Sequence, residues 1–182
     1  MELDNKIEFI FRALSKGLST KDIYIVVLRE KYGTSLFPFP ISKEHETVIE
    51  CMLYPLQGKK PVLVPSLRQL YAASGVIISS ICINNVAEGE FKADVYQIHD
   101  GEETSCVVSA GDALILALYF RVPIYVDQRL MKEAFSNGSE HTFSLSIKSL
   151  SKDMLKDALE EAIKKEQYEI ASIIRDELKK RE

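Results

Sequence analysis

The stretch CVVSAGDALILALYFRVPIYV, residues 106–126, contains a strand, a helix and another strand in immediate succession. Its first six residues are typical of a short strand or bulge, and Asp112 stands at the head of the apolar helix that follows. The last five residues, 122–126, predict a buried strand with Pro123 near its start. Strands and a helix joined this closely indicate that both kinds of element belong to one domain.

The residues before this stretch form strands and helices in clusters. We expect one helix to begin after Ser42 and another at Pro65, while Gly33 supplies a positive φ in a turn between two strands. Pro38 and Pro40 restrict their strand to an edge of the sheet. Runs of β-branched and aromatic residues predict strands at 7–14, 23–30, 35–42, 76–86 and 91–99. Clustered strands indicate an α+β fold with mixed or antiparallel pairing rather than a doubly wound sheet.

Composition describes an ordinary globular chain. Of its 182 residues, 46% are hydrophobic and 27% are charged, which excludes a disordered or collagen-like protein. The net charge of −4 shows no basic excess that would point to nucleic acid. No apolar run is long enough to span a membrane, and the first residues, MELDNKIEF, are unlike a secretion signal. We therefore expect a cytoplasmic protein without a membrane partner, whose three cysteines stay reduced.

A change in composition near residue 150 divides the chain into a domain, 1–150, and a tail, 151–182. The segment HTFSLSIKSL, 141–150, alternates apolar and polar residues and predicts one more edge strand. The tail contains no Gly or Pro, and its apolar residues recur at helical spacing on two stripes. These stripes are Leu155, Leu159, Ala162 and Ile163, then Tyr168, Ala171, Ile174 and Leu178. The tail is either a helical hairpin that turns at 165–167 or one long helix.

The tail LKDALEEAIKKEQYEIASIIRDELKK, 155–180, resembles the UVR motif, a helical hairpin shared by excinuclease subunits B and C and by some protease adaptors. The resemblance implies a tail that binds a UVR-containing partner protein or a second copy of itself. A plain amphipathic tail is the alternative. The residues expected to bind the partner are Tyr168, Ala171, Ile174, Arg175 and Leu178.

Residues from about 20 to 135 resemble the bifunctional nuclease domain family, whose members often carry a UVR motif at the C-terminus. Three segments carry the likeness: LFPFPISKEHETVIE at 36–50, KPVLVPSLRQLYAASG at 60–75, and SAGDALILALYFRVPIYV at 109–126. The resemblance implies a nuclease that acts on DNA and RNA. Hydrolysis of a phosphodiester generally uses a divalent metal or cationic side chains, so Mg²⁺ or Mn²⁺ is the expected cofactor.

The polar residues of the family pattern are only partly present. Asp112 matches the aspartate of the family's Arg-Pro-Ser-Asp-Ala pattern. The three residues before it differ, because Ser109, Ala110 and Gly111 stand in place of Arg-Pro-Ser. His45 stands where the family has a glutamate, between Glu44 and Glu46. The resemblance makes Asp112, His45, Glu44 and Glu46 the catalytic candidates, with Asp112 and Glu44 as metal ligands. A simpler interpretation treats the acids as first-turn residues of helices.

Two functions remain open, a metal-assisted nuclease and a non-catalytic adaptor that recruits a partner through its tail. Lys59, Lys60, Arg68 and Arg121 could form a basic surface for nucleic acid, although scattered surface charge explains them equally well. Residues 76–83 and 122–126 predict strands apolar on both faces, in a sheet whose edges need protection. We therefore expect a homodimer formed through the first domain.

Overall fold

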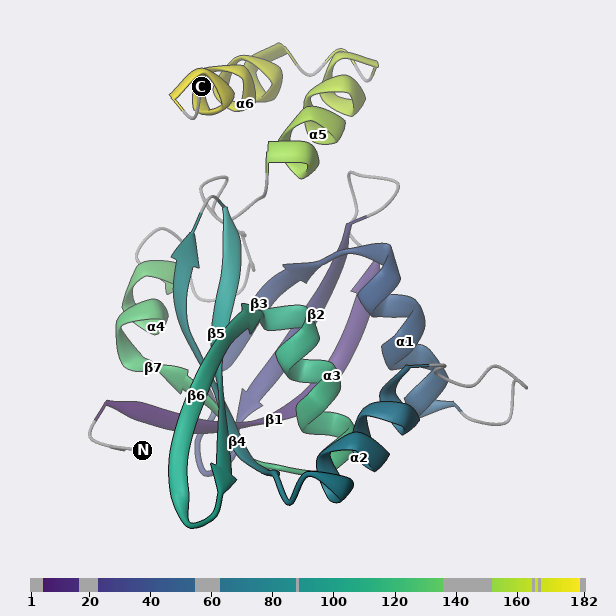
Figure 1. Cartoon of the computed structure of the whole chain (residues 1–182). Coiled ribbons are helices and arrows are strands. Elements are labelled where there is room, and N and C mark those ends of the chain that lie inside the picture. The colour runs from purple at the N-terminus through teal and green to yellow at the C-terminus, as the bar shows by residue number, and fades with distance from the viewer. Residues whose placement is uncertain are drawn as a thin grey trace.

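Seven strands form one mixed sheet in the computed structural model, in the order β3-β2-β1-β7-β4-β5-β6 (Figure 1). The structure describes residues 5–16, 23–54, 63–87, 89–135, 152–164, 166 and 168–180. The strands are β1 (Lys6–Lys16), β2 (Tyr24–Glu30), β3 (Leu36–Ile41), β4 (Ile77–Ala87), β5 (Glu90–His99), β6 (Glu102–Ser109) and β7 (Ile124–Asp127). The helices are α1 (Lys43–Leu53), α2 (Val64–Ala73), α3 (Ala110–Phe120), α4 (Gln128–Phe135), α5 (Lys152–Lys164) and α6 (Tyr168–Lys180). This arrangement confirms the predicted α+β class.

Neighbouring strands of the sheet are antiparallel except β4 and β7, which run parallel. As predicted, β3 lies at an edge and pairs with β2. Pro38 and Pro40 are two residues apart, so the positions without an N–H face the same side of the strand. That side is the unpaired edge, where no hydrogen bond is lost.

Helices α1, α2 and α3 lie together over one face of the sheet (Figure 1). The side chains of Ala113 and Leu114 in α3 are fully buried, which agrees with the apolar sequence of this helix. Beneath the helices, four aromatic rings pack with centroids 5.6–6.2 Å apart. These rings belong to Phe9, Phe37, Phe39 and Phe91.

Four local predictions were wrong. The positive-φ glycines of the described residues are Gly75, Gly89 and Gly101, so Gly33 does not supply a left-handed turn position. The strand expected at 106–111 begins already at residue 102, because a turn through Asp100 and Gly101, both with positive φ, folds β6 back onto β5.

The third helix begins at Ala110 rather than Asp112, because the Ser109 side chain caps it and accepts a hydrogen bond from the Asp112 N–H. Helix α4 was not predicted. Asp127 Oδ1 accepts the Arg129 N–H at 2.8 Å and so caps the start of α4. The edge strand predicted at 141–150 lies outside the described residues.

The C-terminal helices α5 and α6 pack against each other and bury a small apolar cluster of their own. Leu155, Ala162, Ala171 and Ile174 are the buried members of this cluster. Glu166, between the helices, has a φ of 58°, which is the left-handed conformation of a sharp reversal. The tail is therefore a helical hairpin rather than one long helix. Within the described residues, no helix is both long and apolar enough to cross a membrane.

Candidate functional site

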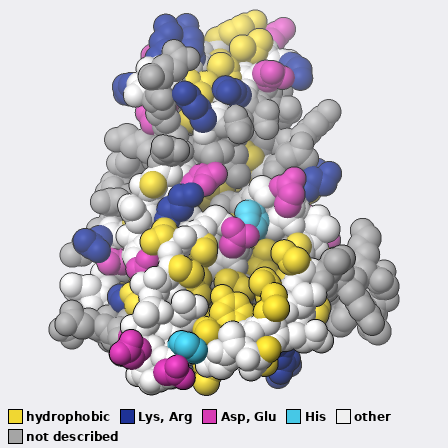
Figure 2. All heavy atoms as spheres, viewed as in Figure 1, with side chains coloured by type: hydrophobic (Ala, Val, Ile, Leu, Met, Phe, Trp, Pro, Cys, Tyr) yellow, Lys and Arg dark blue, Asp and Glu magenta, His cyan; other side chains and the backbone are white. Residues whose placement is uncertain are grey.

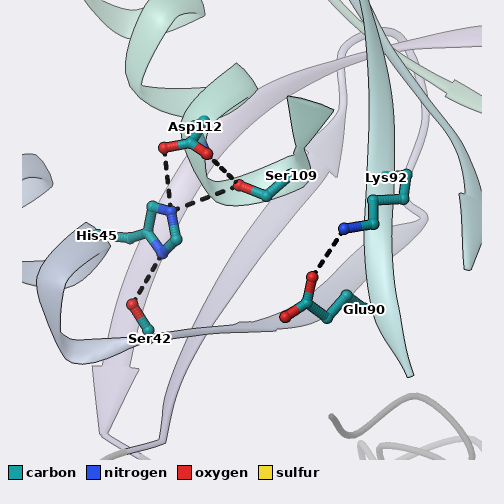
Figure 3. Close-up of polar contacts among 6 residues, drawn as sticks. All are labelled: Ser42, His45, Glu90, Lys92, Ser109 and Asp112. Carbon is teal, nitrogen blue, oxygen red and sulfur yellow. Dashed lines mark hydrogen bonds and ion pairs between the residues drawn. The ribbon is translucent and has the colours of Figure 1, made fainter. Parts of the chain in front are cut away.

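Two helices of the sheet domain begin beside each other, and their first turns form one polar cluster (Figure 3). Ser42 is the N-cap residue of α1 and Ser109 is the N-cap residue of α3. The third residue of each helix, His45 in α1 and Asp112 in α3, points toward the other helix. The cluster therefore joins two segments that are 67 residues apart in the sequence.

Short hydrogen bonds connect these four side chains. The imidazole of His45 is 2.9 Å from Ser42 Oγ at its Nδ1 and 3.2 Å from Asp112 Oδ1 at its Nε2. Ser109 Oγ donates to Asp112 Oδ2 at 2.6 Å and lies 3.4 Å from His45 Nε2. Asp112 therefore uses both carboxylate oxygens, and the imidazole uses both ring nitrogens.

The hydrogen bonds define the charge of Asp112 and the tautomer of His45. The His45 imidazole, with the Ser109 hydroxyl, holds the pKa of Asp112 below its usual range, although burial acts in the opposite direction. Asp112 is therefore a carboxylate at neutral pH and only accepts hydrogen bonds. In the neutral imidazole, Nε2–H then donates to Asp112, which leaves Nδ1 as the acceptor for the Ser42 hydroxyl.

Ser42 does not use its side chain to cap α1. Its hydroxyl faces His45 Nδ1, and it also holds the pKa of Glu44 below the usual range. One hydroxyl has a single proton, so donation to His45 and donation to Glu44 are alternatives. The Ser42 oxygen consequently lies next to two groups that can take its proton.

A cation lies beside the cluster on the neighbouring strand. The register of β5 and β6 places Lys92 opposite Ser109, and the Lys92 charge contributes to the lowered pKa of Asp112. Lys92 Nζ forms an ion pair with Glu90 Oε2 at 2.8 Å, and its side chain is 30% exposed (Figure 3). The sequence analysis did not identify Lys92, Ser42 or Ser109 as site residues.

Gly111 gives the His45 ring the space that it needs. A Cβ atom at this position would lie 2.7 Å from two carbon atoms of the imidazole. Carbon atoms at that distance overlap, so any larger residue has to displace the ring or the helix. Gly111 therefore lets the imidazole of His45 lie against the first turn of α3.

The structure brings His45 and Asp112 together but separates the other predicted site residues. Glu44 is exposed and approaches Ser42, whereas Glu46 contacts Thr47 on the same helix. Arg68 lies in the middle of α2 and Arg121 directly after α3, where both line a pocket away from the cluster, and Lys59 and Lys60 are outside the described residues.

The predicted partner-binding residues of the tail differ in accessibility. Ala171 and Ile174 are buried in the hairpin, whereas Tyr168 is 68% exposed. Arg175 is exposed and bonds to Asp176 and Ser172 on its own helix, and Leu178 is partly buried. The exposed apolar residues that accompany Tyr168 are Ile163 and Ile173.

The donor atoms of the cluster do not make a complete metal centre. Among the described residues, no group of three or more His, Cys, Asp or Glu side chains could hold an ion. Asp112 and His45 are two donors, and each already bonds to the other. The expected ligand pair Asp112 and Glu44 has no third protein ligand within the described part of the chain.

The sheet domain corresponds to a known family. Residues 26–138 match the model of the family described as the bifunctional nuclease domain. Because this match covers more than half of the chain, the protein belongs to that family.

Two relatives extend the comparison. Proteins from Mycobacterium tuberculosis strains CDC 1551 / Oshkosh and ATCC 25618 / H37Rv are each 30% identical to this chain over 112 residues. Both are named as uncharacterized proteins, and the alignment covers 60% of this chain and 65% of each relative. The match thus spans slightly less than two thirds of the relatives' own length.

Proposed function

We propose that this protein cleaves phosphodiester bonds of DNA or RNA at the cluster formed by Ser42, His45 and Asp112. The observation that carries the proposal is the pair of hydrogen bonds that runs from Ser42 Oγ through His45 to Asp112, at 2.9 and 3.2 Å. Membership of the bifunctional nuclease domain family supports the choice of a phosphodiester as substrate.

In the proposed reaction, Ser42 Oγ attacks phosphorus and its proton moves to His45 Nδ1. The bond from phosphorus to the oxygen of the leaving strand breaks, and this oxygen takes the proton back from the imidazolium. Water, deprotonated by His45, then hydrolyses the phosphoserine ester and restores Ser42. Asp112 stabilises the imidazolium that forms and keeps the ring in the tautomer whose Nδ1 can accept a proton. A positioned base of this kind typically contributes 10²- to 10⁴-fold to a rate.

Negative charge on the phosphoryl oxygens needs a positive partner in the transition state. Lys92 is the cation beside the cluster, and the first turns of α1 and α3 add the positive ends of two helix dipoles. Lys92 would exchange its contact with Glu90 for the substrate phosphate.

A cleavage assay with purified protein tests the proposal. Single-stranded DNA and RNA are incubated with Mg²⁺, with Mn²⁺ or with EDTA, and wild type is compared with His45→Gln and Asp112→Asn. We expect both variants to lose about 10²-fold or more of the cleavage rate while keeping the wild-type circular dichroism spectrum. Cleavage at the wild-type rate by both variants would remove the cluster from the reaction. The incubations with Mg²⁺, Mn²⁺ and EDTA test whether cleavage requires a divalent metal ion, which is also part of the proposal.

We further propose that α5 and α6 form a UVR-type hairpin that binds a second such hairpin, on another protein or on a copy of this chain. The two helices bury Ala162 and Ala171, whose small side chains allow close approach. Ile163 and Ile173 remain 53% and 57% exposed, so apolar surface is left for a partner after the hairpin closes. A non-catalytic adaptor would keep this tail function even if the cleavage assay gave no product.

The homodimer predicted for the sheet domain also stays a proposal. Figure 2 shows hydrophobic side chains gathered on the face that carries α2 and α3. Leu63, Leu70 and Ile77 are each more than 60% exposed. Light scattering of the full chain at micromolar concentration tests it, because a monomeric mass contradicts the proposed dimer.

A further inference from the structure

A pocket of about 560 Å³ opens near the C-terminal ends of α1 and α3, whose N-terminal turns form the polar cluster. It is lined by Cys51 and Met52 near the end of α1, Arg68 of α2, and Tyr119, Phe120 and Arg121 at the end of α3. The lining residues of α1 and α3 follow His45 and Asp112 by six to nine residues, so roughly 9–14 Å of helix separates this pocket from the cluster. The pocket is therefore a separate site.

Two arginines from different elements meet at this pocket. Within the described part of the chain, neither the Arg68 side chain nor the Arg121 side chain makes a hydrogen bond or an ion pair. The C-terminal ends of α1 and α3 supply only about half a negative charge each. Among the described residues that line the pocket, the charged ones are Arg68 and Arg121, so the lining is positively charged.

The backbone of Arg121 indicates that its side chain is needed at this position. Arg121 follows the last turn of α3 with φ 58° and ψ 44°, the left-handed conformation that glycine adopts without strain. An arginine at such a position pays a conformational cost, and backbone strain of this kind often accompanies a functional side chain. The residue that tolerates the strain is one of the two cations in the pocket.

Aromatic and aliphatic side chains make up most of the remaining lining residues. Tyr119 and Phe120 are half-buried aromatic residues, and the Phe120 ring packs edge-on against Tyr71 with centroids 5.9 Å apart. Met52 and Leu118 add flexible and aliphatic surface. A volume of about 560 Å³ lies within the range of pockets that bind small molecules.

We propose that this pocket binds a nucleoside monophosphate. Guanidinium groups recognise phosphate through paired hydrogen bonds, and aromatic side chains stack on the face of a base. The phosphate would bind between Arg68 and Arg121, with the base against Tyr119 and Phe120. The same chemistry is offered by a free nucleotide and by the phosphorylated 5′ end of a strand.

Isothermal titration of the full chain with AMP, adenosine and inorganic phosphate tests the site. We expect AMP to bind, and adenosine and phosphate each to bind at least tenfold more weakly, because each supplies half of the contacts. Arg68→Gln should weaken AMP binding at least tenfold. Arg12→Gln is the matched control, because Arg12 is an exposed arginine of β1 away from the pocket, and it should bind like wild type.

Arg121→Gly separates binding from folding. Glycine relieves the left-handed strain, so the melting temperature should stay the same or rise while AMP binding falls at least tenfold. A 5′-phosphorylated oligonucleotide, titrated in parallel, distinguishes a strand end from a free nucleotide. The proposal is overturned if neither AMP nor this oligonucleotide binds, or if Arg12→Gln weakens binding as much as Arg68→Gln.

Discussion

His45 Nε2 lies 3.2 Å from Asp112 Oδ1, and this contact joins the third residue of α1 to the third residue of α3. Both residues also bond to the serine at the N-cap of their own helix. The pair is thus held from two sides, because rotation of either side chain breaks two hydrogen bonds. A cluster fixed in this way keeps one geometry for the proposed proton transfer.

Gly111→Ala is expected to disturb this contact from within α3. Alanine in place of glycine normally stabilises a helix by roughly 0.5–1 kcal/mol. Here the added Cβ would overlap the His45 ring at 2.7 Å, so we expect a lower melting temperature and slower cleavage.

A double-mutant cycle with His45→Ala separates these two effects of Gly111→Ala. Once the ring is absent, Gly111→Ala should stabilise the protein, so the sign of its effect on the free energy of unfolding reverses. Chemical denaturation of the four proteins measures it. An unchanged sign would mean that Gly111 does not make space for His45.

The two N-cap serines are expected to differ when each is changed to alanine. Ser109 Oγ caps α3 through the Asp112 N–H at 3.1 Å, so Ser109→Ala should cost about 1 kcal/mol of stability. Ser42 makes no capping bond, so Ser42→Ala should change stability much less and reduce cleavage about 10²-fold or more. Thermal unfolding and the cleavage assay give both values. If Ser42→Ala cleaves like wild type, water rather than Ser42 is the nucleophile.

Acidic pH should destabilise the protein through two carboxyl groups. Arg129 holds the pKa of Asp127 below its usual range, and His45 does the same for Asp112. A lowered pKa contributes stability above the unfolded value, which is near 3.9, and this contribution is lost as pH falls through the folded pKa. We therefore expect the melting temperature to fall as the pH is lowered below about 4.

Asp127→Asn should flatten this dependence, since Asp127 is 5% exposed and accepts three hydrogen bonds from Arg129. Asp100→Asn is the control, because the Asp100 side chain is 89% exposed. Melting curves at half-unit pH steps measure both variants. Equal slopes for Asp127→Asn and wild type would show that Asp127 does not contribute to the loss of stability in acid.

The sequence predicts the elements of the sheet domain well where apolar residues follow one period. The elements that were predicted incompletely, β6 and α4, are marked by a turn and by a helix cap instead. Strand β6 is exposed along most of its length and shows no alternation, although the Asp100-Gly101 pair marks the hairpin that forms it. Helix α4 has a cap in Asp127, which is also the last residue of β7. These short-range turn and cap signals could have corrected both elements.

The candidate site was predictable only in part, because it depends on the packing of distant elements. His45 and Asp112 were identified individually by resemblance to a family pattern. Their contact requires α1 and α3 to start side by side, and no local pattern contains that information. Lys92 reaches the cluster through the register of β5 and β6, which the sequence does not determine either.

The tail offers a matched pair of neighbouring residues for the final prediction. Ile174 is 4% exposed and belongs to the cluster between α5 and α6, whereas Ile173 is 57% exposed. Ile174→Asp places a charge between the helices, so the hairpin should open and helical circular dichroism should decrease. Ile173→Asp adds the same charge to the surface, where it costs the hairpin little.

Association of the tail should respond to both variants for different reasons. If the exposed residues bind a second hairpin, Ile173→Asp should abolish association while helicity stays at the wild-type level. Light scattering of the full chain measures self-association, and pull-down with an isolated 151–182 peptide measures binding between hairpins. Lys179→Asp is the control for charge alone, because Lys179 is an exposed residue in the last turn of α6. Wild-type association by Ile173→Asp would mean that the exposed apolar residues of the hairpin bind no second hairpin.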